Sequence, residues 1–117
     1  MITVETRRPY TLVRKIRELI EERTIEKWSY DDDGDFTLNL TQWRNKAWFH
    51  AIRYKARKVE FVIISPAMKS ISRTEYAVYH GKFIEMLIKH LPHLCDSISS
   101  TPQPALKDHI TPPGYED

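Results

Sequence analysis

Acidic side chains, which are of a type that binds cations, cluster around Gly34 in this 117-residue chain. They are Asp31, Asp32, Asp33 and Asp35. A calcium-binding EF-hand loop aligned on Gly34 would need acidic ligands at Ser29 and Leu40, with a helix on each side. The sequence has neither feature. We therefore interpret the cluster as a tight turn, in which aspartates hydrogen-bond their own backbone and Gly34 accepts a positive φ, and we predict no metal here.

Zinc-type ligands occur near the other end of the chain, at His90, His93 and Cys95. Pro92 interrupts a helix between them, and no second ligand pair with zinc-site spacing follows. There is no Gly-x-Ser-x-Gly elbow, and three glycines are too few for a phosphate-cradling loop. We predict no cofactor and no catalytic residue, and we keep a small enzyme with a spatially assembled site as a second alternative.

A basic segment between residues 44 and 58 contains no acidic residue and has Trp48, Phe49 and Tyr54 between its charges. Its cations are Arg44, Lys46, Arg53, Lys55, Arg57 and Lys58. Cationic side chains contact phosphates, and exposed aromatic rings stack on bases, so nucleic-acid binding is the first alternative function. The net charge of +2 is too small to favour it by itself. Alternatively, Arg53, Lys55 and Arg57 would only solvate the outer face of one strand.

The elements that position these side chains follow from hydrophobic periodicity. Apolar residues at helical spacing, from Leu12 to Ile20, predict an amphipathic helix that begins near Pro9. The period then changes to two, and strands are expected over residues 25–30, 36–40, 47–54 and 59–64. Ser72 and Glu75 form a capping box that begins a second helix, and Pro92 ends it.

This order, α-β-β-β-β-α, predicts an α+β fold. We expect a two-layer sandwich in which a four-stranded antiparallel meander carries the N-terminal and C-terminal helices on one face. Residues 1–95 would form a single domain. Residues 96–117, rich in proline, would form an extended or disordered C-terminal arm.

The strands carry more large apolar side chains than one covered sheet face can hide. The second face should present Phe49, Arg53, Lys55, Val62 and Ile64. An apolar patch with a charged rim marks an association surface, and a second copy, another protein or peptide, or the chain's own C-terminal arm would cover it. We expect a non-catalytic interaction module that binds through this face, with a homodimer as the first expectation because two-fold dimers are the commonest oligomers.

Cys95 is the only cysteine, so an intrachain disulfide is impossible. Residues 1–8 lack the apolar run of a signal peptide, and no apolar run approaches the roughly 20 residues that span a bilayer. We expect a cytoplasmic protein without membrane association.

Overall fold

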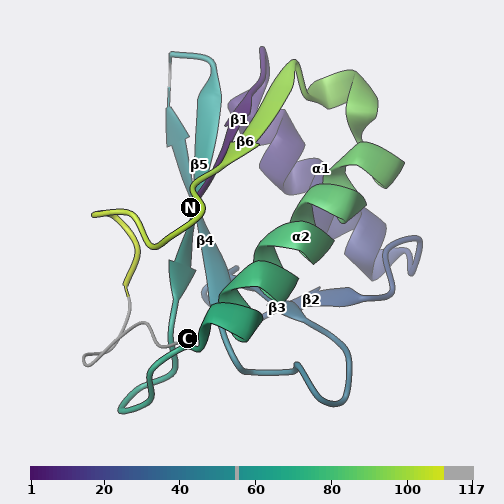
Figure 1. The fold of residues 1–117 in the computed structure, drawn as a ribbon. Helices are drawn as coiled ribbons and strands as arrows, with labels where there is room; N and C mark the ends of the chain where they lie inside the picture. The colour runs from purple at the N-terminus through teal and green to yellow at the C-terminus, as the bar shows by residue number, and fades with distance from the viewer. Residues whose placement is uncertain (55, 110–117) are drawn as a thin grey trace.

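The computed structural model describes residues 1–54 and 56–109 as an antiparallel sheet with two α-helices (Figure 1). The elements in chain order are β1 Ile2–Glu5, α1 Pro9–Glu21, β2 Trp28–Tyr30, β3 Phe36–Leu38, β4 Trp48–Tyr54, β5 Lys58–Ile64, α2 Arg73–His90, the 3₁₀ turn η1 Pro92–Leu94 and β6 Ser97–Ser100. The predicted α+β class with two helices is confirmed.

The sheet has six strands in the order β2-β3-β4-β5-β1-β6. The predicted four-stranded sheet is therefore wrong in its strand number, although β2 to β5 are neighbours in chain order. The two additional strands are short. Ile2 and Val4 of β1 are fully buried, and β1 lies between β5 and β6, pairing Val4 with Val59 and with Ile98. A four-residue strand carries too few alternations to be recognised from its period alone.

Both helices lie on the same side of the sheet (Figure 1). Leu12, Val13 and Ile16 of α1 are fully buried. On α2, Phe83 packs against Phe49 of β4 and Phe61 of β5, with ring centroids 4.8 Å apart in each pair. The core is therefore an aromatic cluster between the sheet and the helices.

The predicted start signals of α2 and of the β2–β3 turn are present as hydrogen bonds. The Ser72 hydroxyl accepts from the Glu75 N–H at 3.0 Å, and the Glu75 carboxylate accepts from the Ser72 N–H at 2.8 Å. In the turn, Asp31 Oδ1 accepts from the N–H groups of Asp33 and Asp35.

The segment after η1 departs from the expected arm. Residues 97–100 form β6 at the edge of the sheet, whereas the proline-rich sequence predicts an extended or disordered arm that begins at residue 96. Residues 101–109 then pass to the side of the sheet opposite α2 (Figure 1). His109 forms a parallel β-bridge with Ile64, on the side of β5 where β1 pairs. The rest of the predicted arm, residues 110–117, lies outside the described residues.

Candidate functional site

The face of the sheet that the helices leave uncovered carries a row of large side chains along β4. Residues of β4 alternate in direction, and Phe49 points toward α2, so the neighbouring even-numbered residues point away from the helices. This outer stripe consists of Trp48, His50, Ile52 and Tyr54. His50 is exposed and the other three side chains are half-buried. On β5, Val62 pairs with His50 and Ile64 pairs with Trp48, so both share this face.

The predicted composition of this face is wrong at two positions. Phe49 is fully buried in the core, 5.0 Å from the ring of His80 and 6.1 Å from that of Trp28. Arg53 shares the helix-side face with Phe49, and its guanidinium lies over the Tyr10 ring of α1 at 5.1 Å. Val62 and Ile64 do lie on the outer face, and Lys55 lies outside the described residues.

Residues 101–109 cover part of the outer face. Lys107 Nζ donates to Glu60 Oε1 at 2.7 Å and to the Tyr54 hydroxyl oxygen at 2.8 Å. Burial alone would raise the pKa of Glu60, but hydrogen bonds from Lys107 and Tyr54 hold it below its usual value. Val62 is only 1% exposed. The β5 half of the face is therefore largely closed by the chain itself, and the outer stripe on β4 is the part that stays accessible.

Opposite charges flank the outer stripe. On the β3 side, Asp35 Oδ1 lies 2.7 Å from His50 Nδ1, and the carboxylate oxygens of Asp31, Asp33 and Asp35 lie within 4.8 Å of one another. On the β5 side, the ammonium groups of Lys58 and Lys107 lie 5.0 and 5.1 Å from the centre of the Tyr54 ring. We name these groups the acidic flank (Asp31, Asp33, Asp35) and the basic flank (Lys58, Lys107).

Those cations of the proposed nucleic-acid segment that the structure describes do not form one patch. Arg44 and Lys46 lie in the loop before β4, beside Lys69 of the β5–α2 connection. Arg57 and Lys58 lie at the far end of the β4–β5 hairpin, and Arg53 packs on Tyr10. Because β4 separates the two groups, the continuous basic and aromatic surface expected for nucleic-acid binding is not formed by the described residues.

The three potential zinc ligands also stay apart. Among the described residues, His90, His93 and Cys95 do not gather into a common set of ligand atoms. Burial, and next the charge of Asp96, raise the pKa of the Cys95 thiol to about 11. A thiol with such a pKa is protonated at neutral pH and is a poor nucleophile.

A buried polar cluster joins α2 to both ends of the described chain. The amino group of Met1 donates to the Tyr76 hydroxyl at 2.9 Å and to Asp108 Oδ2 at 3.1 Å, and its nitrogen lies 3.0 Å from His80 Nε2. His80 Nδ1 lies 2.7 Å from the Tyr76 carbonyl oxygen, to which it must donate. Both ring nitrogens of His80 are thus engaged within the fold, and we interpret this histidine as structural rather than as a general base.

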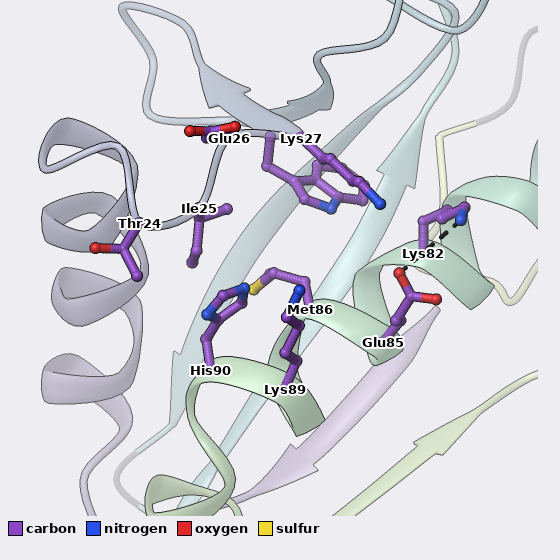
Figure 2. Close-up of a pocket in the computed structure, with 10 residues that line it drawn as sticks. Thr24, Ile25, Glu26, Lys27, Lys82, Glu85, Met86, Lys89 and His90 are labelled. Atoms are coloured by element: carbon purple, nitrogen blue, oxygen red, sulfur yellow. Dashed lines mark ion pairs between the residues drawn. The ribbon is translucent and has the colours of Figure 1, made fainter.

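A pocket that is not predictable from the sequence lies on the helix side, between residues 24–28 and one face of α2 (Figure 2). Its volume is about 140 Å³. The lining residues are Thr24, Ile25, Glu26, Lys27, Trp28, Lys82, Glu85, Met86, Lys89 and His90. We name it the Trp28 pocket.

The floor of the Trp28 pocket is apolar and its rim is charged. Ile25, Trp28 and Met86 are 3%, 2% and 5% exposed. Figure 2 shows Lys82 paired with Glu85 at the rim, 3.9 Å between Nζ and Oε1. The only sequence signal for this pocket is the helical spacing of four α2 residues, which places them on one face: Lys82, Glu85, Met86 and Lys89. This spacing does not predict that the loop before β2 packs opposite that face of α2.

Comparison of this chain with protein-family models, with curated proteins and with solved structures gave no match. Neither helix within the described residues is both long and apolar enough to cross a bilayer.

Proposed function

We propose that this protein is a non-catalytic binding module that uses the outer stripe to associate with another protein chain. The observation that carries this proposal is the row of Trp48, Ile52 and Tyr54, half-buried and in the centre of a sheet face that neither α1 nor α2 covers. Large aromatic and aliphatic side chains within a polar rim are the composition of interface cores. Trp and Tyr are also the residues that most often dominate binding energy.

The occupant that fits this face best is a second copy of the chain. The acidic flank and the basic flank lie on opposite sides of the stripe. A two-fold axis parallel to β4 turns one copy over the other, so that each acidic flank faces the partner's basic flank. Such charge complementarity directs association and fixes its register, and closed two-fold dimers are the commonest oligomers. A different protein or peptide on the same stripe is the other outcome of the test.

The proposal is tested by measuring the mass of the full chain in solution. Size-exclusion chromatography with light scattering should give a dimer mass at about 100 µM, the concentration at which even a weak micromolar dimer is largely formed. Ile52→Glu places a charge in the middle of the stripe and should give a monomer. Ile88→Glu is the matched control, because Ile88 is 58% exposed on α2, and it should remain dimeric.

A monomeric parent chain at this concentration would overturn self-association. A dimer that survives Ile52→Glu and is lost in Ile88→Glu would place the interface on the helices instead of the sheet. A monomer that captures a defined peptide, with capture lost in Ile52→Glu alone, would keep the stripe as a binding surface and change its occupant. The cytoplasmic location predicted from the sequence remains part of this proposal.

A further inference from the structure

The Trp28 pocket combines an apolar floor, an indole N–H open to the pocket and two rim lysines, none of which has a hydrogen-bond or ion-pair partner of its own among the described residues. We propose that it binds a small organic carboxylate whose apolar body is about the size of one benzene ring. This site lies on the helix side of the sheet, away from the outer stripe, so it is independent of the proposed dimer interface.

The donor is the indole N–H of Trp28. The side chain is 2% exposed, and its rings contact Phe49, Tyr79 and Phe83 in the core. Within the described part of the chain the indole nitrogen donates to no acceptor, and it is not one of the fully buried side-chain atoms that lack a partner, so this N–H is open to solvent in the pocket. The N–H of a largely buried tryptophan usually has a hydrogen-bond partner, and a donor that is open to the pocket can form that bond with a bound molecule. Since Trp28 lines the pocket, an acceptor atom of a ligand would supply that partner.

The charge of the rim selects the sign and the number of charges on the ligand. Lys27 and Lys89 form no ion pair among the residues that the structure describes, and both are exposed at the rim. In Figure 2 the side chain of Lys89 extends from α2 toward residues 24–28, beside Met86. Lys82 is already paired with Glu85. Three lysines against Glu26 and Glu85 leave one net positive charge, which a monoanion balances and a dianion exceeds.

His90 does not add to this positive charge at neutral pH. Burial, and next the charge of Lys89, lower the pKa of His90. The neutral imidazole closes the end of the pocket next to Met86 (Figure 2). The pocket therefore offers two free ammonium groups and one indole N–H above an apolar floor, which matches a carboxylate attached to an apolar body.

The volume limits the size of that body. The pocket holds about 140 Å³, and an engineered apolar cavity of about 150 Å³ is known to accept benzene. Nucleotides and larger cofactors exceed this space. Benzoate has the required charge, acceptor atoms and size, and benzamide is its neutral counterpart of nearly equal shape.

The experiment is a titration of the ¹⁵N-labelled full chain with benzoate, followed on the indole N–H resonances. Trp28 is assigned by the resonance that Trp28→Phe removes, and Trp43 and Trp48 are the internal references. We expect a saturable downfield shift of the Trp28 resonance, with a dissociation constant on the order of 1 mM or below, and no saturable shift of the other two. Benzamide should bind at least about tenfold more weakly, because it lacks the charge that strengthens such hydrogen bonds.

Substitutions at the rim of the pocket test whether benzoate binds there, and they leave the core unchanged. Lys27→Gln and Lys89→Gln should each weaken benzoate binding about three- to tenfold, as expected for losing one charge-assisted contact. Lys69→Gln, an exposed lysine of the β5–α2 connection, is the matched control and should leave binding unchanged. Absence of a saturable Trp28 shift, equal binding of benzamide, or an equal loss in Lys69→Gln would each overturn the proposal.

Discussion

Trp48 and Phe49 are adjacent aromatic residues, and the direction of each decides which surface of the sheet is available. Phe49 is fully buried against α2, whereas Trp48 is half-buried on the opposite face. The sequence does not distinguish them, because large apolar residues occur at alternate positions on both faces of β4. Ala51 lies on the same face as Phe49 and is 8% exposed, and its small size leaves room for the helix-side aromatic rings.

His80 is the residue whose titration should affect stability most clearly. Burial, and next the charge of the Met1 amino group, lower its pKa to about 4, and Asp108 and the Tyr76 carbonyl act in the opposite direction. In the unfolded chain the pKa of histidine is about 6.5. Below that value the unfolded state binds more protons than the folded state, so stability is complete above it and falls as pH decreases toward 4. The loss amounts to about 2–3 kcal/mol.

This prediction is measured by urea unfolding of the parent chain and of His80→Gln at pH values between about 7 and 4. The variant should be less stable at neutral pH and should lose less stability on acidification. His93→Gln, in the exposed turn η1, is the control and should follow the parent curve. Parallel curves for the parent chain and His80→Gln would show that His80 does not contribute to acid sensitivity.

At the scale of elements, two glycines in different elements should respond oppositely to alanine. Gly81 lies inside α2, and a Cβ there would meet nothing within 4 Å, so the close approach to the sheet that would explain a glycine there does not exist. Gly34, in the β2–β3 turn, has a φ of +81°, and a Cβ there would lie 2.6 Å from Arg17 Nη2. Arg17 also donates to the Gly34 carbonyl oxygen at 3.1 Å, which ties the turn to α1.

Gly81→Ala should stabilise the protein by about 0.5–1 kcal/mol, because alanine loses less backbone entropy in a helix. Gly34→Ala should destabilise it by about 1–2 kcal/mol, because an L-residue is strained in the left-handed region and Arg17 must move. Thermal unfolding measures both, with a shift of a few degrees expected in each direction. A destabilising Gly81→Ala would mean that α2 packs more closely at this position than described.

At the scale of the whole molecule, the arrangement of charge around the outer stripe predicts how the proposed dimer responds to charge reversal. Asp33→Lys should weaken association, since it places like charges opposite the partner's basic flank. Lys58→Glu should also weaken association, since it places a carboxylate opposite the partner's acidic flank. The double variant restores opposite charges and should recover most of the parent association. Sedimentation at low and high salt measures this, because screening reduces the contribution of exposed charges.

The charge-reversal series separates this arrangement from a dimer of another geometry. If both single variants associate as the parent chain does, the flanks do not face each other. If both weaken association and the double variant weakens it further, the two positions contribute independently and the two-fold axis parallel to β4 is incorrect.

The amino-acid sequence alone determined the features that depend on near neighbours. Periodicity predicted both helices and the four strands β2 to β5, the aspartates with Gly34 predicted the turn, and Ser72 with Glu75 predicted the start of α2. Each of these depends on side chains and backbone groups a few residues apart, where spacing and type decide the hydrogen bonds that form.

Only the tertiary structure decided which face of β4 the helices cover, where β1 and β6 join the sheet, and which side residues 101–109 follow. It also brought residues 24–28 opposite α2 to form the Trp28 pocket. These features depend on contacts between segments far apart in the chain. Their free energies come from burying surfaces against one another, which no local pattern in the sequence expresses.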